Sequence, residues 1–479
     1  MTWRFRRDTF QNIIELVASP DCSLEQLAKC PNVRAAFKRQ LKNLIDYLVP
    51  NIQEIIDIVL GDKKESELVS SMCMYFMTNQ SPSFTAQFSN NPLFLMRLSN
   101  CLTKENNANS KSLISFSRIL EFLVKVSNGF VLKMYPDKFN LLPRLLTHIN
   151  DFSVYSLLCE ITDHGHKVTL EYLESINASK MIFESLGENT FLNGRILTLL
   201  TNIISSGIPG SPLVTYLVDE EHLNKIFELA LSENQQVSSQ SFKLLLEIYG
   251  LCDEELDDED DDETDAYRIS TFIMSKIPDM CDFIGSNKPY CAGKTVCNEL
   301  LVSAIATCEK IPSKVYSLLK SLFPKMFGQP TTSSLHCLFL KLFNAVADRD
   351  EDFLSKFDVR HQIVSQFQKK DLTLAAYWGH LYSITSRILE SKVHYPNECP
   401  GWNDFLINTY LKMKKIMIKQ YGGPLPRDND DSDMYSSDIE FKPPSKFYLM
   451  SERKNIKFIT QDEIDADFDD RLALLARQP

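Results

Sequence analysis

Three short segments of the sequence carry residue types that could do chemistry, and none has the spacing that its chemistry requires. The first is Gly293-Lys294-Thr295, which resembles the end of a phosphate-binding loop. Such a loop needs another glycine five positions before its Gly-Lys pair, so that the backbone can wrap around the phosphates. The residue at that position is Lys288, so we expect a plain helix start there instead of a nucleotide site.

The second segment, His336-Cys337, has the order of a cysteine-phosphatase nucleophile, in which a phosphate-binding arginine follows the cysteine after five residues. Phe343 occupies that position within an apolar stripe, so the pair is expected to pack in the core. The third segment, Asp163-His164-Gly165-His166, gathers possible metal ligands without a matching set nearby. We expect a structural or surface role for it, with metal binding as the alternative.

No G-x-S-x-G nucleophile elbow occurs in the sequence either. Because none of these fragments forms a coherent constellation, the sequence predicts a protein that is not an enzyme. We expect no catalytic residues, no cofactor and no bound metal.

The composition favours a large helical protein. The chain has 479 residues, 44% of them hydrophobic, which is enough apolar material for a large packed core. With 15 glycines and 21 prolines it has too few turn formers for an all-β fold. Of its net charge of −12, most lies in residues 253–265, which hold eleven acids and no base. Without clustered lysine and arginine, nucleic-acid binding is not expected.

The cysteines and the start of the chain bear on its location. None of the 12 cysteines forms a C-x-x-C pair, and the opening MTWRFRRDTF has no apolar signal region. No apolar run of 18 residues occurs, so no membrane span is expected. These features predict a cytoplasmic protein, with a nuclear location also left open.

Apolar residues recur at helical spacing from residue 7 to about 420, with frequent breaks marked by proline or glycine. Short helices that are apolar on one face must stack to bury that face. The sequence therefore predicts an all-α fold, an armadillo- or HEAT-like α-solenoid with repeats of about 40 residues. The clearest stripes lie at 113–124, 192–204, 296–305 and 335–346.

Two segments interrupt this pattern. Residues 253–265 repel one another and are predicted to be a disordered acidic loop, which divides the solenoid into residues 1–252 and 266–421. Residues 422–479 are predicted to be a mostly disordered tail. Its semi-hydrophobic end is expected either to dock on a partner or to fold back on the chain's own body.

Several stretches resemble the SAPS-domain family, the phosphatase-associated proteins that act as regulatory subunits of protein phosphatase 6-type enzymes. The longest runs from Phe116 to Leu158 and is similar to the family's Phe-Ser-Lys helix, Asp-Lys-Phe turn and Leu-rich helices. The other matching pieces are Trp3-Arg4-Phe5, the segments 22–27 and 40–48, the Y-x-G-H-L element from Tyr377 to Leu381, and the W-x-x-F of Trp402 and Phe405. Residues 165–370 resemble the family mainly in their pattern of helices, without matching motifs.

The resemblance implies a non-catalytic scaffold that binds a Ser/Thr protein phosphatase catalytic subunit, protein phosphatase 6-like, and directs it to substrates. Further adaptor or substrate proteins are implied as additional partners. The alternative is another helical-repeat adaptor, such as a nuclear transport or assembly scaffold. Transport armadillos line their groove with repeated tryptophans, and this chain has only 3.

The residues that the resemblance suggests for partner binding are two sets of aromatic and histidine side chains. For Trp3 and Phe5, the alternative is that they cap the first core layer of the solenoid. For the second set, the alternative is a helix crossing in which Gly379 admits a neighbouring backbone and His380 is a core residue. The expected partner-binding residues are Trp3, Phe5, Tyr377, Trp378 and His380.

Overall fold

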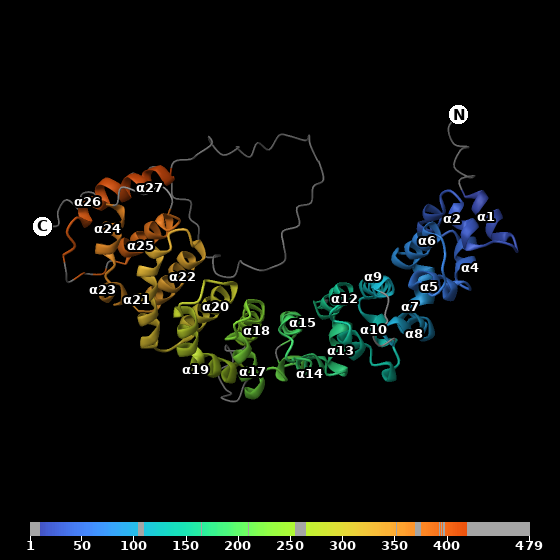
Figure 1. The fold of residues 1–479 in the computed structure, drawn as a ribbon, viewed down its shortest axis with the longest axis horizontal. Coiled ribbons are helices and arrows are strands. Elements are labelled where there is room, and N and C mark those ends of the chain that lie inside the picture. Colours follow the sequence, from blue (N-terminus) through green and yellow to red (C-terminus); the bar gives the residue numbers. More distant parts are fainter. Residues whose placement is uncertain are drawn as a thin grey trace. The chain divides into compact units, whose positions relative to one another are not determined.

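In the computed structural model the described part of the chain consists of helices joined by turns and loops, and it contains no strand (Figure 1). The described residues are 10–103, 110–163, 165–208, 210–253, 265–350, 352–368, 375–391, 393, 395 and 398–418. The prediction of an all-α protein is thereby confirmed. The chain divides into two compact units, Met1–Asp350 (unit 1) and Glu351–Pro479 (unit 2).

Short helices form the first part of unit 1. Local capping explains several of their boundaries: Ser23 and Gln26 cap each other at the start of one helix, and Pro82 and Pro92 are the first residues of two others. These helices are α1 (Gln11–Ala18), α2 (Leu24–Lys29), α3 (Val33–Lys38), α4 (Lys42–Leu48), α5 (Ile52–Leu60), α6 (Glu67–Thr78), α7 (Pro82–Ser89) and α8 (Pro92–Leu98), followed by the 3-10 helix η1 (Ser99–Thr103).

From α9 onward, a first row of helices runs through unit 1, and each member packs against the next. The four apolar stripes of the sequence lie within this row. On the last of them, the stripe from Leu335 to Val346 is buried, with Phe339 and Phe343 fully enclosed. The row consists of α9 (Ser110–Ser127), α12 (Phe152–Asp163), α15 (Thr190–Ser206), α18 (Gln235–Asp253), α20 (Ala292–Thr307) and α22 (Ser333–Arg349).

A second set of helices covers this row from the other side (Figure 1). The set comprises α10 (Phe130–Lys133), η2 (Asp137–Phe139), α11 (Leu141–Thr147), α13 (Lys167–Ser175), α14 (Ala178–Glu184), α16 (Pro212–Thr215), α17 (Glu220–Ala230), α19 (Asp265–Gly285) and α21 (Ser313–Gly328). Six of its members, α10, α14, α16, α17, α19 and α21, pack on helices of the row, and α11 and α13 pack on other members of the second set.

The predicted acidic loop falls between α18, which ends at Asp253, and α19, which begins at Asp265. Residues 254–264 lie outside the described residues, as does the predicted tail, 422–479. The helices that flank the acidic segment pack directly on each other. The boundary between compact units falls instead after Asp350.

Unit 2 is smaller and rich in aromatic residues. Helix α24 packs on α26, and α26 continues through a π-helical turn into the last described helix. Its elements are α23 (Phe353–Lys356), α24 (Arg360–Phe367), α25 (Trp378–Glu390), α26 (Trp402–Phe405), the π-helix η3 (Leu406–Tyr410) and α27 (Leu411–Ile418).

Within the described ranges, no helix has the combination of length and apolar character that crossing a membrane demands.

Candidate functional site

Of the residues expected to bind a partner, the structure brings three together at the start of α25. Tyr377 is buried at 6% exposure and precedes the helix, whereas Trp378 and His380 are half-buried in its first turn. Trp3 and Phe5 lie outside the described residues. Trp378 and His380 are therefore the described residues of this predicted site that remain partly accessible to a partner, while Tyr377 belongs to the core.

Trp378 belongs to a continuous group of rings, which we call the unit 2 aromatic cluster: Phe367, Tyr377, Trp378, Trp402 and Phe405. The centroid of the Trp378 ring lies 4.8 Å from that of Tyr377 and 4.8 Å from that of Phe367. Phe367 in turn lies 4.8 Å from Phe405, which lies 5.4 Å from Trp402. Tilted ring pairs at these distances are favourable beyond their buried area. The W-x-x-F element of the sequence therefore helps to hold unit 2 together.

The structural alternative for the Y-x-G-H-L element is wrong in two respects. A Cβ built on Gly379 has no heavy atom within 4 Å, so this glycine admits no neighbouring backbone. His380 is half-buried and not a core residue. The first turn of α25 thus presents Gly379 to the surface with His380 partly accessible beside it.

Gly293-Lys294-Thr295 lies at the start of α20, as the sequence predicts for a plain helix start, and Cys291 is the N-cap. Lys294 is only 1% exposed, and its Nζ donates hydrogen bonds of 2.8 Å to the carbonyls of both Ser286 and Lys288. Burial lowers the pKa of this ammonium group. Lys294 therefore anchors the preceding loop through these two hydrogen bonds.

The other two chemical fragments also make structural contacts. His336 is buried, and its Nε2 lies 3.0 Å from the carbonyl oxygen of Gln329. Its neighbour Cys337 is exposed, so only the histidine and Phe343 follow the core prediction. The Nδ1 atom of His166 accepts a hydrogen bond from the Val168 backbone and caps α13. In the described part of the chain no group of three potential metal ligands occurs.

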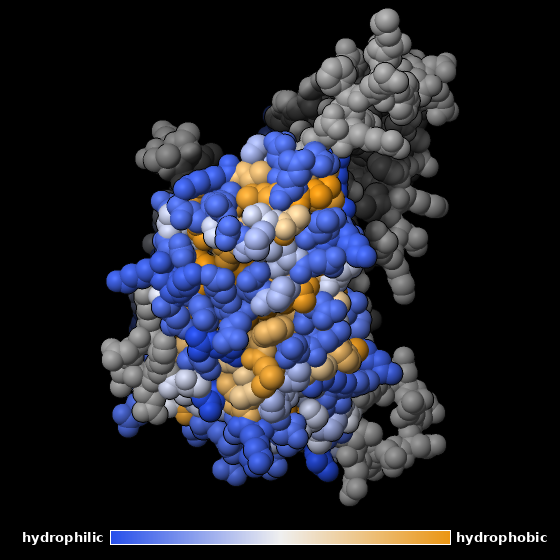
Figure 2. Space-filling view, turned by 90° about the vertical axis from the view of Figure 1, so that its right-hand side faces the viewer, coloured by the Kyte–Doolittle hydropathy of each residue, from blue (hydrophilic) through white to orange (hydrophobic). Residues whose placement is uncertain are grey.

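Exposed apolar side chains are scattered over both units. Phe152 is 75% exposed and Leu93 is 74% exposed. Figure 2 shows the end of unit 1 that carries its first helices, where apolar patches alternate with hydrophilic surface. Isolated exposed apolar residues are ordinary in folded proteins, and nothing in these patches selects a ligand.

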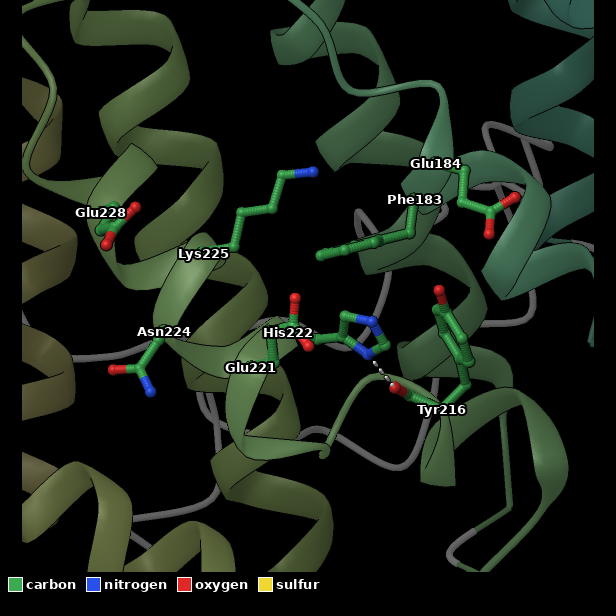
Figure 3. A pocket seen from close by; sticks show the side chains of 8 residues that line it. All are labelled: Phe183, Glu184, Tyr216, Glu221, His222, Asn224, Lys225 and Glu228. Atoms are coloured by element: carbon green, nitrogen blue, oxygen red, sulfur yellow. Dashed lines mark hydrogen bonds between the residues drawn. The ribbon is translucent and has the colours of Figure 1, made fainter.

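A more specific site lies in unit 1 where α14 and the segment after α16 meet α17. It is a cavity of about 530 Å³, which we call the α14–α17 pocket (Figure 3). Aromatic rings and charged side chains line it together, and no continuous stretch of sequence supplies them. The lining residues are Phe183, Glu184, Tyr216, Glu221, His222, Asn224, Lys225 and Glu228.

Three rings form one corner of this pocket. The centroid of the His222 ring lies 4.3 Å from that of Tyr216 and 4.6 Å from that of Phe183. The Nδ1 atom of His222 lies 2.7 Å from the Tyr216 carbonyl oxygen, which fixes the imidazole in place. Burial raises the pKa of the Tyr216 hydroxyl, and the negative charges of Glu184, Asp219 and Glu221 add to this effect.

Sequence reasoning missed this pocket because its ring residues come from three elements. Phe183 ends up beside Tyr216 and His222 only through the packing of α14, α16 and α17. None of the segments has a recognisable motif. The available signal was weaker: an aromatic-acidic pair, Phe183-Glu184, at the end of a helix.

Comparisons with known proteins do not identify this chain. No protein-family model matches the sequence, and no curated protein matches it. Among solved structures, the chain is similar to an engineered protein of known crystal structure at 10% sequence identity. The match has a TM-score of 0.35 and covers 80% of this chain and 98% of the engineered protein.

Proposed function

We propose that the chain is an armadillo- or HEAT-like α-solenoid that serves as a non-catalytic scaffold in the cytoplasm. It binds a Ser/Thr protein phosphatase catalytic subunit, protein phosphatase 6-like, and directs that enzyme to its substrates. The main observation that supports an α-solenoid scaffold is that contacts recur in unit 1 between positions about 40 residues apart.

These contacts are side-chain hydrogen bonds that join helices about 40 residues apart in the chain. The side-chain amide of Asn202 donates to Thr162 Oγ1 at 3.3 Å, and that of Asn298 donates to the Leu338 carbonyl at 3.3 Å, each across 40 residues. Lys325 donates to the Gly285 carbonyl at 2.8 Å, also across 40 residues. A repeat of this length is typical of HEAT and armadillo arrays, in which each unit buries its face against the next.

The partner is proposed from the resemblance of the sequence to the SAPS-domain family. The longest similar stretch, from Phe116 to Leu158, covers most of α9 and continues into α12, two helices that pack on each other. The matching Trp402 and Phe405 lie in the unit 2 aromatic cluster. Similar pieces thus occupy positions that build the helical body, which supports a shared fold for the whole array.

Mechanistically, such a scaffold acts without chemistry of its own. A preformed helical surface holds the phosphatase and a substrate or adaptor together, so that dephosphorylation proceeds at high effective concentration. Lys294 and His336, the residues most suggestive of catalysis, are engaged in hydrogen bonds to backbone carbonyls. Their geometry supports a structural role for both fragments.

Affinity purification of the tagged full chain from cells of its source organism, followed by mass spectrometry, tests the proposed partner. A phosphatase catalytic subunit is expected among the leading bound proteins. Variants Trp378→Ala and His380→Ala should reduce its recovery, while His361→Ala, on the exposed side of α24, serves as the control. A bound set dominated by transport factors, with no phosphatase, would overturn the proposal in favour of the other helical-repeat adaptor.

A further inference from the structure

The α14–α17 pocket combines two features that together select a cation. The first is its aromatic corner, where the rings of Phe183, Tyr216 and His222 meet at centroid distances of 4.3 to 6.0 Å, with Phe183 in a T-shaped arrangement to the other two. Aromatic faces attract positive charge. The Phe183 ring already makes such a cation–π contact, because the ammonium nitrogen of Lys225 lies 4.9 Å from its centroid.

The second feature is an excess of negative charge. Glu184, Glu221 and Glu228 line the pocket against the single ammonium of Lys225. Among the described residues, neither Glu221 nor Glu228 takes part in an ion pair, and Glu184 has only a 3.9 Å contact with the exposed Lys180. An unpaired carboxylate at the mouth of a pocket is available to a positively charged ligand.

The position of Glu184 runs against local helix preference. It is the last residue of α14, where the partial negative charge of a helix C-terminus disfavours a carboxylate. Glu221, in the first turn of α17, has the opposite setting and contributes to the start of its helix. Its 3.9 Å contact with the exposed Lys180, four residues earlier in the same helix, is a weak ion pair, so the Glu184 carboxylate remains available to a cation in the pocket.

His222 adds a hydrogen-bond acceptor to the carboxylates of the pocket. A carbonyl oxygen can only accept, so the 2.7 Å contact between His222 Nδ1 and the Tyr216 carbonyl places the hydrogen on Nδ1. In the neutral ring, Nε2 is then a hydrogen-bond acceptor. Figure 3 shows this second nitrogen directed away from that carbonyl, toward the space between the Phe183 and Tyr216 side chains.

We propose that the α14–α17 pocket binds an arginine side chain from a basic segment of a partner protein. A guanidinium is planar and stacks on an aromatic face while its N–H groups point outward in the ring plane. Stacking at the aromatic corner would direct those donors to the Glu184 carboxylate and to His222 Nε2, with Glu221 nearby. An ammonium group offers neither the flat face nor the fork of donors, so arginine is favoured over lysine.

This inference does not depend on the phosphatase proposal. It rests on the contacts within residues 183–228 of unit 1 and holds for any partner that carries an exposed arginine. A failed search for a bound phosphatase leaves it standing. Failure of the peptide experiment below leaves the scaffold proposal standing.

Fluorescence anisotropy with the full chain tests the site. The probe is a fluorescein-labelled peptide, Gly-Ser-Arg-Gly-Arg-Ser-Gly, and its partner probe carries citrulline, the neutral isostere, in place of both arginines. We expect the arginine peptide to bind at least tenfold more tightly. The double variant Glu184→Gln/Glu221→Gln should lose about tenfold in affinity, because it removes charge while keeping side-chain volume.

The control is Glu220→Gln, which removes one negative charge next to Glu221 in the same helix turn but outside the pocket lining. It should change the affinity by less than twofold. Equal binding of the citrulline peptide would overturn the proposal. So would binding that the double variant leaves unchanged, because the peptide would then be held elsewhere, for example by the acidic segment 253–265.

Lys225 gives a second, opposite readout. Its ammonium occupies a position over Phe183 and repels an incoming guanidinium, so Lys225→Met should tighten binding of the arginine peptide about threefold. Weaker binding by this variant would contradict the assignment. Arg453 and Lys454 are adjacent basic residues of segment 422–479. If the wild-type chain binds no peptide but an Arg453→Gln/Lys454→Gln variant does, the occupant is the chain's own tail, and the proposed partner is overturned.

Discussion

The side-chain amide of Asn298 on α20 donates a hydrogen bond to the main-chain carbonyl of Leu338 on α22, with 3.3 Å between the two atoms. Both residues are buried, at 1% and 2% exposure. A polar side chain enclosed in this way is stabilising only while its partner is present. The bond therefore contributes to the register between α20 and α22.

Replacing Asn298 with alanine should lower the free energy of unfolding by about 1–2 kcal/mol, the usual cost of a lost buried hydrogen bond. Urea denaturation followed by circular dichroism measures this change. Gln235→Ala, at an exposed position of α18, is the control and should be nearly neutral. An unchanged midpoint for Asn298→Ala would show that the bond contributes nothing to register.

Phe339 lies at the centre of the α22 stripe, fully buried, with its ring centroid 5.2 Å from Phe323 and 5.9 Å from Phe343. Phe339→Ala should cost about 3–5 kcal/mol, because it removes a large apolar group and leaves a cavity. Phe152→Ala makes the same chemical change at a ring that is 75% exposed. Thermal and urea unfolding should separate the two variants; equal losses would contradict the packing described for α22.

The stripes on α9, α15, α20 and α22 were predictable because one local rule, the 3.6-residue period, decides which face is apolar. The prolines were equally informative: α7, α8 and α16 each begin at one. Within a stripe the rule is coarser. Ile114 belongs to the first one and is nevertheless 42% exposed, because adjacent apolar residues cannot both face the same neighbour.

The α14–α17 pocket could not be predicted in this way, because it depends on distances between helices. Phe183 and His222 are ordinary in their own segments and acquire meaning only when their rings lie 4.6 Å apart. The same holds for Gly379, where the sequence suggested close packing and the structure shows open space. Because glycine has no side chain, its presence in the sequence does not indicate whether its surroundings are packed or open.

Gly129 and Gly61 offer a matched test of tight packing. Both have positive φ, 83° and 82°, so alanine at either position costs about 1–2 kcal/mol in backbone strain. A Cβ at Gly129 would also lie 1.9 Å from Thr169 Oγ1, whereas one at Gly61 meets nothing within 4 Å. Gly129→Ala should therefore cost about 2–5 kcal/mol in urea denaturation. Adding Thr169→Ala should recover part of that loss; equal costs at the two glycines would contradict the close approach.

Burial raises the pKa of the Cys73 thiol to about 12, with smaller contributions from the charges of Glu54 and Glu65. At pH 8.5 this residue should remain a protonated thiol and resist iodoacetamide, while the exposed Cys337 reacts. Mass spectrometry of the alkylated protein distinguishes the two sites. Rapid labelling of Cys73 in the folded chain would contradict its enclosed position.

The same shift predicts a dependence of stability on pH. An unfolded cysteine loses its proton near pH 8.5, but folded Cys73 keeps its proton until about pH 12. The stability that this thiol contributes is fully present below about pH 8.5 and is lost as the pH rises toward 12. Between pH 9 and 11, Cys73→Ala should show a shallower fall in unfolding free energy than the wild type, by up to about 1.4 kcal/mol per pH unit. Parallel profiles for the two proteins would contradict this.

The acidic segment between α18 and α19 is expected to be dispensable for folding. Eleven acids in residues 253–265 repel one another within a Debye length of about 8 Å at physiological salt, and the flanking helices already pack together. Replacing residues 254–264 with the same number of glycines and serines should leave the melting temperature nearly unchanged. We expect the removed charge to show only in the rate at which a basic partner associates at low salt, because steering by exposed charge is screened as salt rises. A large drop in melting temperature would instead show that the segment contributes to the packing of α18 on α19.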